Sequence, residues 1–179
     1  MNLFYKLFAK NNRENFDISN LIWSWIGSFL GLFAIAFFHR NFLDDSDLTL
    51  VLSSFGASAV LIYGAINSPL AQPKNLIGGH IISAIIGVFC YKLFGENLLF
   101  AAAIAVSSSI LVMQLTLTLH PPGGATALIA VIGTPQIHDL GYFFVIFPVF
   151  SGALILFLIA FVINNIPKNR HIQRVLKII

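Results

Sequence analysis

His120-Pro121-Pro122-Gly123-Gly124-Ala125-Thr126-Ala127 interrupts a hydrophobic stretch that runs from Leu115 to Ile132. Proline has no backbone N–H, and the residue before a proline avoids the helical region. We therefore expect His120 and Pro121 to be extended. Proline suits the first turn of a helix, so a helix is expected to begin at Pro122 or Gly123. The stretch is thus predicted to cross a membrane as a short extended part followed by a half-helix.

Composition places the whole chain in a membrane. Hydrophobic residues make up 58% of the 179 residues, charged residues only 9%, and the mean hydropathy is +0.88. A soluble domain carries about 25% charged residues, so lipid must cover most of this surface. The net charge of +3 comes from basic residues in tails and loops, where they act as topology signals. A nucleic-acid partner is therefore not expected.

Six hydrophobic segments follow one another along the chain, at about 21–38, 48–66, 76–93, 98–113, 115–132 and 141–163. Residues 1–18 are predicted to form an interfacial segment, 19–163 the transmembrane domain and 164–179 a basic tail. Because both tails are basic, both termini are predicted to be cytoplasmic. That placement requires an even number of crossings, which six segments satisfy.

A short pattern occurs twice. Leu-Thr-Leu-x-Leu is followed after three or four residues by Gly-Ala-(Ser/Thr)-Ala, at 48–59 and again at 115–127. Each copy lies in the middle of three segments, and a unit of three crossings must enter the second time from the opposite side. The predicted fold is therefore an all-α polytopic membrane protein with a 3+3 inverted repeat. Repeat one covers about 20–94 and repeat two about 97–163, and the second and fifth segments are both predicted to be broken.

Two broken segments would bring two helix N-termini together near mid-membrane. Free amides and the helix dipole favour an anion at such ends. The alternative is that the glycines only permit close helix packing. The predicted substrate-binding residues are Ser54, Phe55, Gly56, Ala57, Ser58, His120, Pro121, Pro122, Gly123, Gly124, Ala125 and Thr126.

Histidine is the best side-chain candidate for contact with the solute. His120 can donate to an anion or carry a proton, or simply cap a helix. A cytoplasmic vestibule or gate is predicted to involve Gln72, Lys74, Asn75 and His80. Every Asp and Glu falls in a tail or loop, so a cation site inside the membrane is not expected. The sequence has no metal-ligand spacing and no nucleotide-binding motif, and neither a cofactor nor a catalytic residue is expected.

Four motifs, in order, resemble the HPP family of integral membrane proteins, which is named for the triplet His120-Pro121-Pro122. They are Gly56-Ala-Ser-Ala-Val-Leu61, Ser68-Pro-Leu-Ala-Gln-Pro-Lys-Asn75, Ile77-Gly-Gly-His80 and His120 to Ala127. The resemblance implies a bacterial inner-membrane or plastid-envelope protein, and an inner-membrane location is expected. Some cyanobacterial and plastid members are nitrite transporters. The family is usually described with four membrane helices, in contrast to the six segments here.

The leading interpretation is a transporter or channel for a small anion, with nitrite suggested by the resemblance. A scaffold or assembly protein without transport is the first alternative. An intramembrane serine hydrolase is the second, with Ser58 as nucleophile and His80 or His120 as base. A bundle of six short segments also favours a homodimer.

Overall fold

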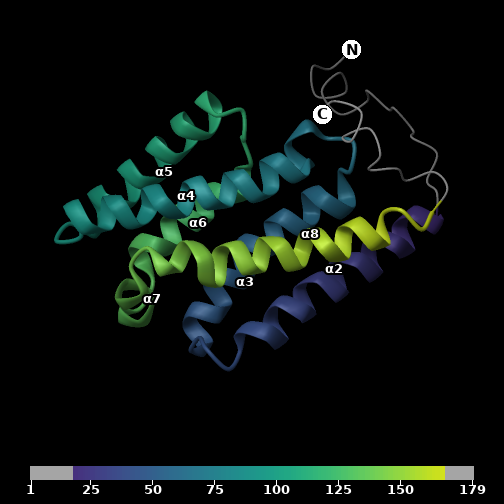
Figure 1. The fold of residues 1–179 in the computed structure, drawn as a ribbon, viewed down its shortest axis with the longest axis horizontal. Helices are drawn as coiled ribbons and strands as arrows, with labels where there is room; N and C mark the ends of the chain where they lie inside the picture. The colour runs from purple at the N-terminus through teal and green to yellow at the C-terminus, as the bar shows by residue number, and fades with distance from the viewer. Residues whose placement is uncertain (1–17, 168–179) are drawn as a thin grey trace, which may run out of the picture.

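The computed structural model describes residues 18–167, and these form helices with no strand among them (Figure 1). The predicted interfacial segment, except for Ile18, and most of the predicted basic tail lie outside the described residues. The helices are α2 (Ile18–His39), α3 (Asp45–Ala59) with its continuation η1 (Val60–Gly64), η2 (Pro69–Ala71), α4 (Pro73–Phe94), α5 (Leu98–Leu115), α6 (Pro121–Ile132), α7 (Pro135–Leu140), and η3 (Val145–Phe150) continuing into α8 (Ser151–Ile163).

Five helical stretches are long and apolar enough to cross a membrane, with 18 to 22 residues each. At about 1.5 Å per residue they reach roughly 27–33 Å, close to the thickness of a hydrocarbon core. The sixth apolar helix, α6, has only 12 residues and reaches about 18 Å. Residues 18–167 therefore form a bundle of five long helical stretches and the shorter apolar helix α6, with the short helices η2 and α7 in the connections.

The first and last long helices, α2 and α8, lie side by side, and their termini identify the two ends of the bundle. In Figure 1, α2 begins and α8 finishes at the same end, as an even number of passages requires. At the opposite end, the first turn of α3 is joined to the α6–α7 turn. The buried carboxylate of Asp47 accepts hydrogen bonds from the backbone N–H and the hydroxyl of Thr134. Which end faces the cytoplasm stays a prediction.

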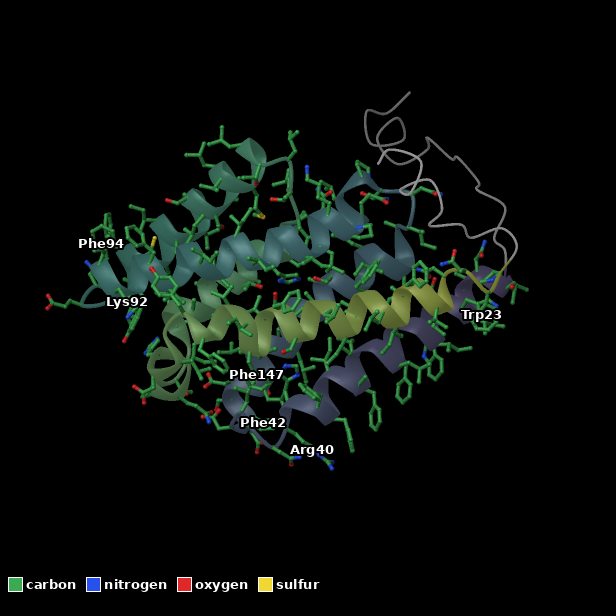
Figure 2. The ribbon with its side chains drawn as sticks, viewed as in Figure 1. Trp23, Arg40, Phe42, Lys92, Phe94 and Phe147 are labelled. Atoms are coloured by element: carbon green, nitrogen blue, oxygen red, sulfur yellow. The ribbon has the colours of Figure 1, made fainter. Side chains whose placement is uncertain are left out.

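Aromatic side chains cover the outer face of α2. Trp25, Phe29 and Phe33 are each more than half exposed, and their rings stack at centroid distances of 5.5 and 5.8 Å. Figure 2 shows Trp23 and Arg40 at opposite ends of this helix. A stripe of exposed rings bounded by an end cation is the surface expected of a helix in contact with lipid.

The predicted break in the second segment is wrong. Helix α3 runs without interruption through Gly56, and its N-terminus lies at Asp45, capped by the Asp44 side chain. The segment contains no proline, and the Thr49 and Ser53 hydroxyls donate to carbonyls four residues earlier on the same helix. In lipid every backbone group needs a partner, and this requirement overrides the extended preference of alternating Leu and Thr.

The chain around the His-Pro-Pro triplet does leave the helical conformation. Helix α5 ends at Leu115, and Leu117 then turns the chain with a φ of 56°. His120 is extended, with φ −138° and ψ 105°, and α6 begins at Pro121. Non-helical backbone is thus confined to 116–120, and helix begins one residue earlier than expected. The inverted repeat stays a prediction, although two facing half-helices are no longer part of it.

Small residues let α4 and α6 approach closely enough for their backbones to touch. A Cβ atom added at Gly79 would lie 2.5 Å from Cβ of His120, and one at Gly123 would lie 2.9 Å from the Gly79 carbonyl oxygen. A Cβ at Gly87 would lie 2.6 Å from the Ala127 carbonyl oxygen. Because the glycines carry no side chain at these close approaches, His80 on α4 and His120 at the start of α6 are held next to each other.

Candidate functional site: a buried cluster of hydroxyls and imidazoles

Five polar side chains lie together inside the bundle. Ser54 and Ser58 come from α3, His80 from α4, His120 from the N-cap of α6 and Thr126 from α6 itself. Each is at most 2% exposed. We call these five residues the polar cluster. Polar groups are rare in the membrane interior because they are expensive there, so a buried group of five is a candidate functional site.

Ser58 stands at the centre of the cluster. Its Oγ lies 2.8 Å from Nε2 of His80 and 2.9 Å from Nε2 of His120. The two imidazole rings are 5.1 Å apart between centroids, inclined at 60°. One hydroxyl therefore bridges two histidines that belong to different helices.

The remaining contacts extend this bridge in both directions. Nδ1 of His120 lies 2.9 Å from the carbonyl oxygen of Leu70 in η2. Nδ1 of His80 lies 2.7 Å from Oγ1 of Thr126, which is 2.9 Å from Oγ of Ser54. The Ser54 hydroxyl is also 3.0 Å from the Pro122 carbonyl oxygen. The result is an unbranched chain of contacts from the connector before α4 to the first turn of α6.

Helical spacing explains why these residues meet. Ser54 and Ser58 are four residues apart, as are Pro122 and Thr126, so each pair lies on one face of its helix. His80 lies seven residues after the start of α4, about 10 Å along its axis. The cluster is therefore about a third of the way across the bundle from the η2 end, rather than at its middle. The short helix α6 runs from this depth to the opposite end.

The predicted substrate residues divide between two faces. Ser54, Ser58, His120, Pro122 and Thr126 take part in the cluster, and Phe55 packs on the His80 ring at 4.8 Å between centroids. Gly123 faces α4, and the exposed Ala57 does not join the cluster. Pro121, Gly124 and Ala125 instead line an apolar groove between α5 and α6.

Free backbone donors are scarce at the start of α6. Pro121 and Pro122 have no N–H, and the Gly123 N–H donates to the His120 carbonyl at 2.8 Å. At the second predicted helix end, Ala57 and Ser58 lie inside α3, where backbone amides bond within the helix. The prediction of an anion held between two rings of free amides is therefore wrong. The donors that the structure does bring together are hydroxyl and imidazole groups.

The predicted vestibule residues have separate roles. His80 belongs to the cluster, whereas Asn75 donates to the Leu119 carbonyl at 2.8 Å and Gln72 to that of Ser68 at 2.9 Å. The amides of Asn75 and Gln72 thus hold the non-helical connectors in place. Lys74 is exposed.

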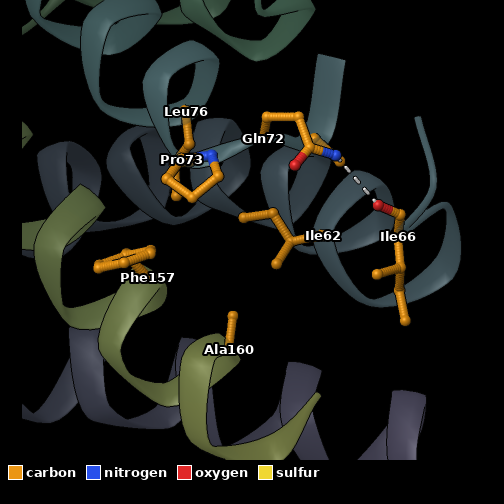
Figure 3. A pocket seen from close by; sticks show the side chains of 8 residues that line it. Ile62, Ile66, Gln72, Pro73, Leu76, Phe157 and Ala160 are labelled. Atoms are coloured by element: carbon orange, nitrogen blue, oxygen red, sulfur yellow. Dashed lines mark hydrogen bonds between the residues drawn. The ribbon is translucent and has the colours of Figure 1, made fainter. Parts of the chain in front are cut away.

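A narrow pocket opens near this connector, with free space for about one water molecule. Figure 3 shows Ile62 and Leu76 in its wall, together with the contact between Gln72 and the Ile66 carbonyl. Ile62 is four residues beyond Ser58, and Leu76 is four residues before His80. The pocket therefore lies one helical turn from the cluster. The buried side chains of Ile62 and Leu76 stand between the pocket and the cluster.

The sequence did not predict the two backbone carbonyls that end the line of contacts. The backbone carbonyls of Leu70 and Pro122 accept from the cluster at its two ends, and no side-chain pattern reports a carbonyl's direction. The grouping of His80 with Ser58 and His120 also depends on helix packing. The Gly-Gly-His and His-Pro-Pro-Gly-Gly motifs contained the relevant signal, because glycines beside a histidine allow another backbone to come close.

Comparison with known proteins agrees with this architecture. The model of the HPP transmembrane region matches residues 13–173. A transmembrane protein of Dictyostelium discoideum is 46% identical over 157 residues, covering 86% of this chain and 55% of its own length. A second Dictyostelium transmembrane protein is 43% identical over 157 residues, covering 86% and 50%. The chain thus spans about half the length of these relatives. No solved structure matches. The chain belongs to the HPP family of integral membrane proteins.

Proposed function

We propose that the protein moves a small solute across a membrane, as a channel or carrier, and that the solute is a small anion with nitrite as the leading candidate. The observation that carries the proposal is the polar cluster. Three helices and a connector bring five polar side chains together beside a large cluster of buried apolar residues. Intramembrane polar groups of this kind mark solute or proton pathways in many membrane proteins.

The chemistry of the cluster favours an anion over a cation. Hydroxyl and imidazole groups can present hydrogens to an anion, whereas a cation such as Ca²⁺ or Mg²⁺ needs several oxygen ligands, with carboxylates among them. Among residues 18–167 no carboxylate contacts the cluster, and no group of His, Cys, Asp and Glu could hold a metal ion. The anion would displace one contact of the cluster and use the hydrogens released.

The narrow pocket supports a route from the η2 end. A solute entering there would meet Ile62 and Leu76 first and then Ser58 and His80 one turn deeper. Separation of these two side chains by a few ångströms would open the route. All five cluster residues belong to one chain, so a homodimer, which we also propose, would contain two separate sites.

A serine hydrolase remains the second candidate, because Ser58 lies within hydrogen-bond reach of two histidines. Such pairing is the arrangement that activates a serine nucleophile. Acyl transfer, however, also needs free donors beside the nucleophile for the developing oxyanion. Ser58 lies inside α3 and is 0% exposed, so its neighbouring amides are engaged in the helix. This arrangement favours transport.

Flux into proteoliposomes tests the proposal. Purified protein should accelerate entry of nitrite, nitrate or formate over protein-free liposomes. The Ser58→Ala variant should alter that flux without abolishing it, whereas a hydrolase would lose all activity on a fluorogenic ester. Absence of flux for all three anions, in protein that remains folded, would rule out the transport proposal and favour a scaffold.

A further inference from the structure

The contacts of the polar cluster determine how many hydrogens the cluster must carry. Its contacts form a line of six: Leu70 carbonyl to His120, His120 to Ser58, Ser58 to His80, His80 to Thr126, Thr126 to Ser54, and Ser54 to the Pro122 carbonyl. All six distances lie between 2.7 and 3.0 Å, within the range of true hydrogen bonds. The additional approach of Ser58 Oγ to the Ser54 carbonyl is 3.4 Å, too long to compete.

The number of hydrogens available does not match the number of contacts. Each hydroxyl carries one hydrogen, and so does each neutral imidazole. The three hydroxyls and two imidazoles therefore supply five hydrogens. Both ends of the line are carbonyl oxygens, which only accept, so six contacts need six hydrogens. With both histidines neutral, the cluster is one hydrogen short.

The two ends determine where the sixth hydrogen must be. At one end, Nδ1 of His120 has to donate to Leu70. At the other end, Ser54 donates to Pro122, Thr126 donates to Ser54, and Nδ1 of His80 donates to Thr126. The two Nε2 atoms then face the Ser58 hydroxyl, which has one hydrogen to give. For all six contacts to be hydrogen bonds, one of these Nε2 atoms has to carry a hydrogen as well, which would make that ring an imidazolium.

From this geometry we propose that the polar cluster is a binding site for one proton, shared between His80 and His120 through Ser58. Transfer of the imidazolium Nε2 hydrogen to the Ser58 oxygen, together with transfer of the Ser58 hydrogen to the other Nε2, exchanges the imidazolium between the rings. The proton count is conserved in this exchange. A second extra proton would make both rings positive at a centroid distance of 5.1 Å, and because like charges repel strongly in a buried site, the capacity of the site is one.

The proton site has a consequence for the solute, and this part rests on the proposed function. The hydrogen bonds of the cluster hold the imidazolium, but its positive charge is uncompensated and attracts a negative charge into the bundle. In residues 18–167 no carboxylate or ammonium group hydrogen-bonds to either histidine. The other titratable groups on the elements that carry or adjoin them are Asp45 and Asp47 on α3, Tyr63 on η1, and Lys74, Cys90, Tyr91 and Lys92 on α4. An entering anion therefore supplies the missing charge, and anion and proton move together.

Nitrogen-15 NMR of imidazole-labelled protein in lipid nanodiscs tests the proton site without any transport. Signals of His80 and His120 are assigned by comparing variants in which each is replaced by Gln. The proposal expects three of the four ring nitrogens of this pair to carry hydrogen over part of the range from about pH 5 to pH 8. Two protonated nitrogens throughout this range would overturn it.

The Ser58 bridge provides a second readout in the same samples. The Ser58→Ala variant removes the shared hydroxyl, and three protonated nitrogens should no longer be observed at any pH in the range. The Ser58→Thr variant keeps a hydroxyl and should restore them. Ser53→Ala is the matched control, because the Ser53 hydroxyl is exposed and donates only to the Thr49 carbonyl of its own helix. A normal spectrum for Ser58→Ala would contradict the shared site.

Coupling is tested in proteoliposomes loaded with a pH-sensitive dye. An inward nitrite gradient should acidify the interior faster than in protein-free liposomes, and a gradient of one pH unit should drive up to about tenfold nitrite accumulation. Ser53→Ala should behave like the unmodified protein and Ser58→Ala should lose the acidification. Nitrite flux that ignores the pH gradient would overturn the coupling. Absence of any anion flux would instead count against the proposed function, and the NMR result would still decide the proton site.

Discussion

Replacing Gly79 by alanine should separate His120 from the cluster. The added Cβ would lie 2.5 Å from Cβ of His120 and 2.9 Å from the Thr118 carbonyl oxygen. Carbon atoms pack at about 3.5–4.0 Å, so the helices must move apart by roughly 1 Å. The contact between His120 Nε2 and Ser58 Oγ, 2.9 Å in the structure, would then lengthen to about 3.9 Å and cease to be a hydrogen bond.

The energetic cost follows from the same displacement. Overpacking by one carbon in a tight interior costs about 1–3 kcal/mol. A chain of this length loses roughly 2–4 °C of thermal stability per kcal/mol, so a decrease of about 2–12 °C is expected. Thermal unfolding of the detergent-solubilised protein measures this decrease, and proteoliposome flux should fall at least tenfold in protein that still inserts.

Gly56 and Gly124 are the matched controls. A Cβ at Gly56 meets no atom within 4 Å, and one at Gly124 meets only a Val106 methyl at 3.7 Å. Both alanine variants gain the same helix propensity as Gly79→Ala. A difference in stability or flux between Gly79→Ala and these two controls therefore reports the effect of packing alone. Each should keep its stability and its flux within twofold. Loss of flux in Gly56→Ala and Gly124→Ala, with normal flux in Gly79→Ala, would refute the reasoning and favour an anion site at helix ends.

Other changes have distinct expected outcomes. His120→Ala should insert normally but transport at least tenfold more slowly or with an altered pH profile, and normal flux at every pH would show that the residue is only structural. Asp47→Ala leaves buried donors of the α6–α7 turn unsatisfied and should cost about 1–3 kcal/mol, visible in thermal unfolding, whereas the exposed Asp45 can be replaced by alanine at little cost. Single cysteines at Asn67 and Asp139, in a cysteine-free background, should react with impermeant maleimide from opposite sides of the membrane; labelling from one side would contradict the six-segment path.

Some of the candidate site was predictable because its signals are local. The two prolines after His120 interrupt a hydrophobic stretch, and a helix does begin there, at Pro121. Ser54, Ser58, Pro122 and Thr126 were also expected near a solute, and all take part in the cluster. The expectation failed at Gly56, where a repeated sequence pattern was taken for a repeated backbone break. Without a proline, that copy of the pattern remains helical.

The sequence by itself determined membrane residence, the number of hydrophobic segments and the non-helical backbone at His120, because hydropathy and proline act over a few residues. Tertiary structure alone decided that His80 faces His120 across Ser58 and that the Leu70 carbonyl closes the line. The reason is that these contacts depend on how deeply α4, α3 and α6 interlock. Close contacts at glycines, such as that of Gly79 with His120, set this depth. Each such contact needs residues from two helices, so the sequence of one helix does not specify it.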